Sequence, residues 1–302
     1  MKVVAGTRDR LRLELTSRSA LAWTLRIGAF LCFVGHGAFG IMTKRAWLPY
    51  FAVANIGPDF AYRLMPIVGT VDIVVGILAL ICPIPATGIW MVSWAVWTAV
   101  LRPLAGESAW EAIERAGNYG VPLALLILLE RRRDLAGIFS RGLPRNLDAD
   151  LLRRLRTALT IAVVFLLVGH GMLGVAGKPG QIENYASLFS APTAVAVTRI
   201  AGGFEILLAA LVTVRPTIGL LVLIAAWKLG TESLFLTAGA SPWEVVERGG
   251  SYAAPIALAI VTALQVRSRL TSSRRALGSS RSSSAESLQQ RTIAAPFHSA
   301  RL

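Results

Sequence analysis

Eight apolar stretches alternate with short polar segments along this chain. Each stretch is roughly 20 residues long, and a helix of that length spans the ~30 Å hydrocarbon core of a bilayer. The stretches are 20–42, 62–82, 87–102, 109–129, 158–176, 193–214, 218–236 and 244–266. The pattern therefore predicts an all-α membrane protein with eight transmembrane helices.

The fourth and the eighth stretch begin with the same motif, W-E-x-x-E-R-x-G-x-Y-x-x-P. It runs from Trp110 to Pro122 and again from Trp243 to Pro255. Because seven residues recur in register, the chain is predicted to be a tandem duplication. Each motif also follows a serine that lies three residues before its first glutamate, which predicts a capping box at the helix start.

Basic residues gather at the start of the chain, between the two copies and at the end of the chain. The positive-inside rule places all three segments, and thus both termini, in the cytoplasm. Each copy then has four spans with both ends inside, so the copies form two parallel-repeat four-helix bundles. We expect five parts: a cytoplasmic N-terminal segment 1–19, a first bundle 20–130, a basic cytoplasmic linker 131–157, a second bundle 158–266, and a disordered, basic, serine-rich tail 267–302.

The composition supports a membrane protein. Only 16% of the 302 residues are charged, whereas soluble domains carry about 25%. A net charge of +14 would suggest nucleic acid in a soluble protein, but this charge lies where it orients membrane helices, so no nucleic-acid partner is expected. The expected location is a cell membrane, multi-pass, and the inner membrane in a Gram-negative bacterium. The lipid bilayer is the main expected partner.

A histidine and an acid lie at similar depths in the first two helices of each copy. His36 lies ~9 Å below the outer end of its helix, and Asp72 lies ~15 Å below the outer end of the next helix. The sequence therefore predicts a His36–Asp72 pair, and a His170–Glu205 pair in the second copy. Acids inside a membrane are usually functional, and histidine suits proton exchange near neutral pH. In the alternative interpretation, each histidine is a structural polar residue whose hydrogen bonds are satisfied at a close helix crossing, because glycines flank both histidines.

The fourth helix of each copy adds a polar stripe, which should face the bundle interior. This predicts two outward-facing polar pockets. Their residues are His36, Asp72, Glu114, Arg115 and Tyr119 in the first copy, and His170, Glu205, Glu247, Arg248 and Tyr252 in the second. The Glu–Arg neighbours in these sets have a second interpretation as structural ion pairs.

Three further features concern charge. Lys44 and Lys178 each lie eight residues past a histidine, where they are candidates to bind an anion or to anchor the helix at the interface. Lys228 and Glu232 form an i, i+4 pair in the second copy only. That pair either lowers the insertion cost of its own helix or marks a divergence of the two pockets.

Motifs for common chemistries are missing from the sequence. It contains no nucleophile elbow, H-E-x-x-H, Walker loop, haem-attachment motif or C-x-x-C. A metal held between the two histidines fits poorly with the surrounding acids and bases. No metal site is predicted, and catalytic activity stays an open question.

The histidines belong to a longer pattern, H-G-x-x-G-x-x-x-K, at 36–44 and 170–178. A G-x-x-acid pattern follows at 69–72 and 202–205. On a four-helix membrane bundle, this order resembles the DoxX-like family, with one such bundle in each copy. The resemblance implies a bacterial inner-membrane protein associated with oxidoreductases, since some relatives belong to thiosulfate:quinone oxidoreductases or to membrane redox-stress complexes. The chain departs from the family in holding two bundles and in carrying Asp72 where Glu is usual.

Three functions are consistent with these patterns. The first, which we favour, is a redox-associated membrane protein that binds a quinone or a small anion at its outer face, with other membrane redox subunits as partners. The second is a small-solute or proton-coupled transporter, which predicts a cavity between the two bundles. The third is a structural scaffold for a membrane complex, in which the ionic motifs only hold helices together.

Overall fold

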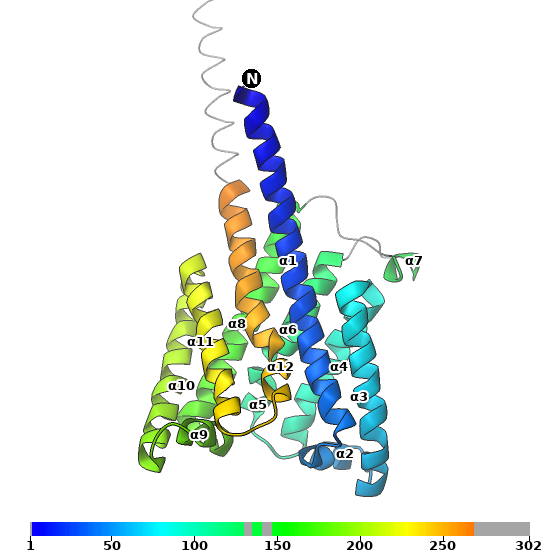
Figure 1. Cartoon of the computed structure of the whole chain (residues 1–302), viewed down its shortest axis with the longest axis vertical. Helices are drawn as coiled ribbons and strands as arrows, with labels where there is room; N and C mark the ends of the chain where they lie inside the picture. Colours follow the sequence, from blue (N-terminus) through cyan, green and yellow to red (C-terminus); the bar gives the residue numbers. More distant parts are fainter. Residues whose placement is uncertain (1, 130–134, 141–146, 269–302) are drawn as a thin grey trace, which may run out of the picture. The chain divides into compact units, whose positions relative to one another are not determined.

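The computed structural model describes residues 2–129, 135–140 and 147–268, and every regular element in these ranges is a helix (Figure 1). Most of the predicted tail and part of the predicted linker lie outside the described residues. The first half of the chain contains α1 (Lys2–Ile41), a 3₁₀ turn (Arg45–Trp47), α2 (Leu48–Val53), α3 (Pro58–Ile81), α4 (Pro85–Leu104), α5 (Ala109–Glu114) and α6 (Ala116–Leu129). We call this the N-terminal half.

The second half repeats the order of helices. After the short α7 (Leu135–Ile138) come α8 (Ala149–Ala176), α9 (Pro179–Ala186), α10 (Ala191–Val214), α11 (Ile218–Thr237) and α12 (Trp243–Glu247). The last helix, Gly249–Ser268, has no label in Figure 1. We call α8 and everything after it the C-terminal half.

Seven helices of the described residues are long and apolar enough to cross a membrane. They are Thr16–Ile41, Pro58–Ile81, Ala109–Leu129, Ala149–Ala176, Ala191–Val214, Ile218–Thr237 and Gly249–Ser268. A helical, multi-pass membrane protein is therefore confirmed. The eighth predicted span, α4, is a helix of 20 residues but is not among the seven, because its tryptophans and Arg102 lower its hydropathy.

Two helices begin earlier than predicted. α1 starts at Lys2 rather than at 20, and α8 starts at Ala149 rather than at 158. Arginine and leucine are good helix formers, so the helices continue past their apolar stretches. Asp148 fixes the start of α8, because its side chain accepts the N–H of Leu151 at 2.7 Å.

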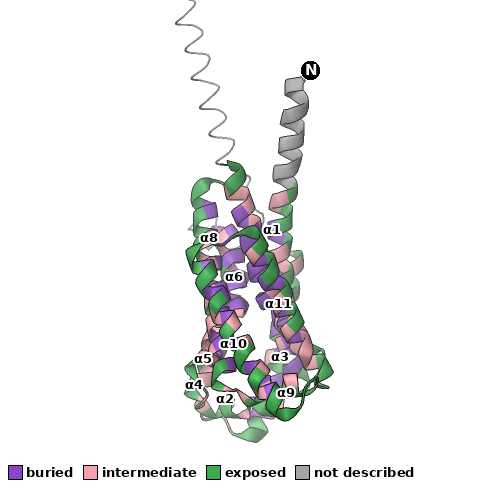
Figure 2. Ribbon diagram, turned by 90° about the vertical axis from the view of Figure 1, so that its left-hand side faces the viewer, coloured by how far each residue is buried: buried purple, intermediate pink, exposed green. Residues whose placement is uncertain are grey.

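The outward faces of α3 and α10 are apolar and exposed. On α3 the exposed residues include Ile67, Val74 and Ile81. A spacing of seven keeps residues on one face of a helix. Figure 2 shows buried positions on the sides of the helices that face other helices, and exposed positions on their outer sides. Lipid chains are the natural solvent for such apolar faces.

Glycines bring α1 against α3 at the level of the His36 motif. A Cβ on Gly40 would lie 2.7 Å from the Gly69 Cα atom, and one on Gly69 would lie 2.4 Å from the Gly37 carbonyl oxygen. The same crossing joins α8 to α10, where a Cβ on Gly202 would lie 2.5 Å from the Gly171 carbonyl oxygen. Such contacts are typical of small residues at membrane helix crossings.

The fourth helix of each half packs against the first helix of the other half. α12 contacts α1, and α5 contacts α8. A Cβ on Gly35 would lie 2.3 Å from the Glu247 backbone nitrogen, and one on Gly169 would lie 2.2 Å from the Glu114 backbone nitrogen. The fourth helix of each half thus crosses to the first helix of the other half, an arrangement that we call the exchange. α5 and α6 also keep contacts with α4 of their own half, so the two halves interlock.

The fourth helices are also interrupted. The helix breaks at Arg115, between α5 and α6, and at Arg248 in the C-terminal half. Each break frees a carbonyl that the arginine itself binds. Arg115 donates to the Glu111 carbonyl at 2.8 Å, and Arg248 donates to the Glu244 carbonyl at 2.6 Å. The break matters because it opens the helix where Gly35 and Gly169 approach.

The glycine crossings give the first testable prediction. Gly202→Ala places a methyl group in contact with the backbone of α8, so we expect a loss of about 1–3 kcal/mol from overpacking. Gly203→Ala is the matched control, since nothing lies within 4 Å of its Cβ position. We expect it to change stability by less than about 1 kcal/mol. Thermal unfolding in one mild detergent measures both, and equal effects would contradict the close crossing.

Candidate functional site

In both predicted His–acid pairs the two side chains are in contact, as their similar depths along neighbouring helices indicated. His36 Nδ1 lies 2.8 Å from Asp72 Oδ2, and His170 Nδ1 lies 2.7 Å from Glu205 Oε2. Both acids are buried, with 1% of the residue exposed in each. The glycine crossings place these pairs, because Gly37 and Gly171 directly follow the histidines.

Beyond the pairs, the two halves differ. Glu205 Oε1 receives two further donors in the C-terminal half: Trp227 Nε1 at 2.9 Å and Lys228 Nζ at 3.3 Å. Lys228 is fully buried and also contacts Glu232 at 2.9 Å. A buried charge is tolerated only when it is paired in this way.

Among the described residues of the N-terminal half, no donor reaches Asp72 Oδ1. Its residues at the positions of Trp227, Lys228 and Glu232 are Trp94, Ala95 and Ala99. Asp72 Oδ1 and Trp94 Nε1 are both buried and make no hydrogen bond within the described residues. Native proteins pair nearly all such atoms, so this place requires an explanation.

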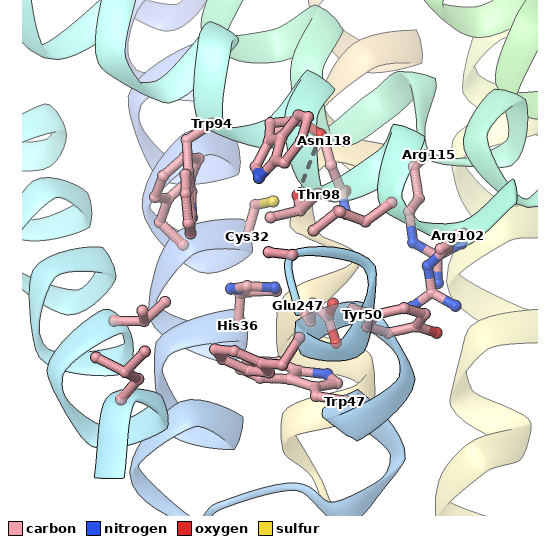
Figure 3. A pocket seen from close by; sticks show the side chains of 18 of the residues that line it. Cys32, His36, Trp47, Tyr50, Trp94, Thr98, Arg102, Arg115, Asn118 and Glu247 are labelled. Atoms are coloured by element: carbon pink, nitrogen blue, oxygen red, sulfur yellow. Dashed lines mark hydrogen bonds between the residues drawn. The ribbon is translucent and has the colours of Figure 1, made fainter. Parts of the chain in front are cut away.

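A cavity of about 280 Å³ lies beside the His36–Asp72 pair (Figure 3). Six aromatic residues line it: Phe33, Trp47, Tyr50, Phe51, Trp94 and Trp97. The Trp47 ring stacks on His36, with ring centroids 4.5 Å apart. Ala95, Arg102, Arg115, Asn118 and Glu247 also line it. We call this the aromatic cavity.

A second cavity of about 420 Å³ is lined by residues of both halves. Its charged residues are Lys44, Arg102, Glu114, Arg115, Lys178, Glu232, Glu244, Glu247 and Arg248. His170 lies on its wall, and Arg102, Arg115 and Glu247 line both cavities. We call this the ionic cavity. It adjoins the aromatic cavity, so together they offer a polar and an apolar region.

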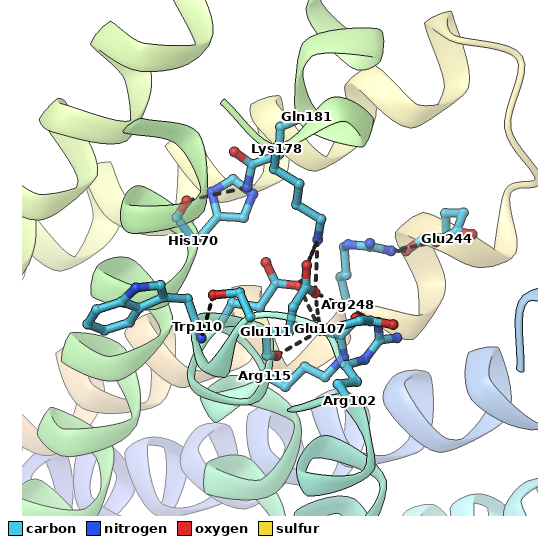
Figure 4. Close-up of polar contacts among 12 residues, drawn as sticks. Arg102, Glu107, Trp110, Glu111, Arg115, His170, Lys178, Gln181, Glu244 and Arg248 are labelled. Atoms are coloured by element: carbon cyan, nitrogen blue, oxygen red, sulfur yellow. Dashed lines mark hydrogen bonds and ion pairs between the residues drawn. The ribbon is translucent and has the colours of Figure 1, made fainter. Parts of the chain in front are cut away.

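Ion pairs tie the halves together across the ionic cavity. Lys44 Nζ lies 2.6 Å from Glu244 Oε1, and Lys178 Nζ lies 2.8 Å from Glu111 Oε1 (Figure 4). Both lysines were candidates to bind an anion, and in the structure their anion is a carboxylate of the other half. These pairs therefore connect the segment directly after the first helix of one half to the fourth helix of the other.

The capping-box prediction is right for the serine and wrong for the glutamate. Ser108 Oγ accepts the N–H of Trp110 at 3.3 Å. The Glu111 carboxylate instead contacts Arg115 at 3.3 Å and Lys178 at 2.8 Å. A glutamate that has cations within reach binds them in preference to a backbone N–H, because charge-assisted contacts are stronger.

The exchanged helices regroup the predicted pocket residues. Glu247 joins His36 at the aromatic cavity, and Glu114 joins His170 at the ionic cavity. Tyr119 lines neither cavity, and its hydroxyl points to the Ala112 carbonyl at 3.5 Å. Likewise, the Tyr252 hydroxyl donates to the Val245 carbonyl at 3.1 Å. Both tyrosines thus bridge the helix breaks rather than completing a pocket.

In the C-terminal half, contacts run without interruption from His170 to Lys44. Glu232 pairs with Lys228 at 2.9 Å and with Arg248 at 2.8 Å. Arg248 then pairs with Glu244 at 2.8 Å, which holds Lys44. The N-terminal half has the corresponding His36–Asp72 pair and the corresponding ion pair to the other half. However, Ala95 and Ala99 stand at the positions of Lys228 and Glu232, which connect the two in the C-terminal half. Ala95 lines the aromatic cavity.

Several residues of these sites escaped the sequence interpretation. Trp94 and Trp227 recur at corresponding positions, and that recurrence was the signal available for them. Trp47, which stacks on His36, belongs to none of the recurring motifs, so they did not mark it. Among the described residues, no group of three or more His, Cys, Asp or Glu side chains could hold a metal ion.

Glu244 lies outside the membrane-spanning helices, and its surroundings alter its acidity. Burial alone raises the pKa of this carboxyl, but Arg248 and Lys44 outweigh burial and lower the pKa below its ordinary 4.5. A lowered pKa in the folded state stabilises the fold above the unfolded pKa. This stabilisation is lost as the pH falls through the folded value.

The second prediction follows from the lowered pKa of Glu244. Glu244→Gln should lower the melting temperature at neutral pH, and the difference from the wild type should shrink below about pH 4.5. Glu183→Gln, at an exposed position of α9, is the control and should have no effect at any pH. Melting curves in detergent from pH 7 to 3 measure this. A difference in melting temperature that stays constant down to pH 3 would rule out the ion pairs of Glu244 as its cause.

A search of protein-family models gave no match to this chain, and comparisons with curated proteins and with solved structures gave no match either.

Proposed function

We propose that this chain is a redox-associated membrane protein whose aromatic cavity binds a quinone ring beside the His36–Asp72 pair. The observation that carries this proposal is the combination of an aromatic cavity of about 280 Å³ with His36 at its wall, where the Asp72 carboxylate binds the histidine ring. Apolar pockets with a few convergent polar groups are the usual form of small-molecule sites.

The proposed architecture has eight spans in two parallel repeats, with both termini and the middle linker in the cytoplasm. The recurring helix order and the recurring motifs support the duplication. The basic segments support the orientation. The ionic cavity would then face outward, which is the periplasm in a Gram-negative bacterium.

The pair would handle protons rather than electrons. Reduction of a quinone to a hydroquinone consumes two electrons and two protons. His36 is positioned to pass a proton, and Asp72 holds its ring through Nδ1 at 2.8 Å, as carboxylates orient catalytic histidines elsewhere. The electrons would come from a partner redox subunit. The DoxX-like resemblance of the H-G-x-x-G-x-x-x-K motif supports the same class of function.

A transporter is the second candidate, because the ionic cavity is lined by both halves. Polar residues at the interface of parallel repeats are one transporter design. However, every lysine and arginine named in this cavity has a carboxylate partner in the structure, which leaves no cation unpaired for a solute. Solute uptake into proteoliposomes that is lost in Glu232→Gln would favour this candidate.

The third prediction tests quinone binding. The full chain in lipid nanodiscs should bind decylubiquinone or its hydroquinone, and His36→Gln should weaken this binding at least tenfold, or about 1.4 kcal/mol. Glu183→Gln should leave it unchanged. Microscale thermophoresis measures the affinity. Absence of binding in both oxidation states, or an affinity that is indifferent to His36→Gln, would contradict the proposed function.

A further inference from the structure

The two halves satisfy their buried acids differently. In the C-terminal half, Glu205 Oε1 receives Trp227 Nε1 at 2.9 Å and Lys228 Nζ at 3.3 Å. In the N-terminal half, Asp72 is one methylene shorter and Ala95 replaces the lysine. Asp72 Oδ1 and Trp94 Nε1 are both left without a partner among the described residues.

One of these orphaned atoms, Trp94 Nε1, belongs to a residue that lines the aromatic cavity. The other, Asp72 Oδ1, belongs to the partner of His36, which also lines the cavity. Ala95, at the position of Lys228, is a third lining residue. The cavity volume of about 280 Å³ far exceeds the ~10–15 Å³ that one water needs. A small organic molecule therefore fits beside the position that the lysine holds in the C-terminal half.

The polar groups at the cavity favour a ligand that donates a hydrogen bond over an anionic ligand. Arg102 already pairs with Glu107 at 3.0 Å, and Arg115 pairs with Glu114 at 2.8 Å. In the part of the chain that the structure describes, Asp72 Oδ1 has no donor, and Glu247 places a second acid at the cavity. An anionic ligand would add a further negative charge beside these two acids, whereas an O–H or N–H group would satisfy Asp72.

We propose that the ligand of the aromatic cavity presents an O–H or N–H donor to Asp72 Oδ1, in the place that the Lys228 ammonium takes against Glu205. This rests on the proposed function and narrows it. A quinone carries only acceptor oxygens, whereas a hydroquinone carries hydroxyls. One hydroxyl can accept from Trp94 Nε1 and donate to Asp72 at the same time. The site thus selects the reduced form. In the C-terminal half, Lys228 already takes the place of the donor, so the ligand binds in the N-terminal half alone.

The donor has a second possible source, a protonated amine, because aromatic walls also stabilise cations. Three probes separate these sources: decylubiquinol, decylubiquinone and phenethylamine, each titrated under argon into the full chain in nanodiscs. We expect decylubiquinol to bind at least tenfold more tightly than decylubiquinone, with one molecule per chain.

Each other outcome has a definite meaning. Equal binding of the two oxidation states overturns the donor inference and leaves the proposed quinone function intact. Binding of phenethylamine alone supports the donor inference and overturns the quinone function. Failure of all three probes to bind overturns both. Two decylubiquinol molecules per chain overturn the assignment to the N-terminal half.

A double variant tests the role of Lys228. Ala95→Lys with Ala99→Glu gives the N-terminal half the ion pair of the C-terminal half, so we expect a folded protein that binds decylubiquinol at least tenfold more weakly. Unchanged binding in the folded variant overturns the proposal. If this variant does not fold, Asp72→Asn replaces it. We expect the preference for decylubiquinol over decylubiquinone to fall below twofold, and a preference that persists overturns the proposal.

Discussion

The rest of this structure depends on a backbone contact between Gly35 and Glu247, with its counterpart between Gly169 and Glu114. Each glycine lies one residue before a histidine, and each contact is made with a helix that breaks at the next residue, an arginine. A side chain at either glycine would meet backbone atoms at 2.2–2.3 Å, so the contact needs glycine. Through it, the first helix of each half meets the fourth helix of the other, and both cavities contain residues from both halves.

This exchange also explains why the W-E-x-x-E-R motifs carry so many charges. Their glutamates bind the lysines that follow the histidines, Lys44 and Lys178, across the boundary between the halves. The arginines bind the carbonyl groups freed by the helix breaks. A buried ion pair costs desolvation and gives little net stability, but losing one partner is expensive. The motifs thus specify how the halves fit together, and the chemistry lies at the pairs behind them.

The sequence predicted the helices well and their partners poorly. Apolar length predicted the spans, and equal depth predicted that His36 meets Asp72 and that His170 meets Glu205. Depth along a helix does not say which neighbour a helix has, so Glu114 was grouped with His36 when it lies with His170. Likewise, no proline or glycine stands at Arg115 to indicate that the helix breaks there. The difference between Ala95 and Lys228 was visible in the sequence. Its consequence was not, because only the structure shows which acid Lys228 reaches.

Exchange of the fourth helices is the claim on which both cavities rest, and cross-linking of cysteine pairs tests it most directly. In a chain with Cys32→Ala and Cys82→Ala, a short bis-maleimide should join Lys44→Cys to Glu244→Cys, and Lys178→Cys to Glu111→Cys, in native membranes. The pairs within one half, Lys44→Cys with Glu111→Cys and Lys178→Cys with Glu244→Cys, should give little product. Mass spectrometry of the digested protein identifies each link. Efficient links within the halves, and none between them, would contradict the exchange.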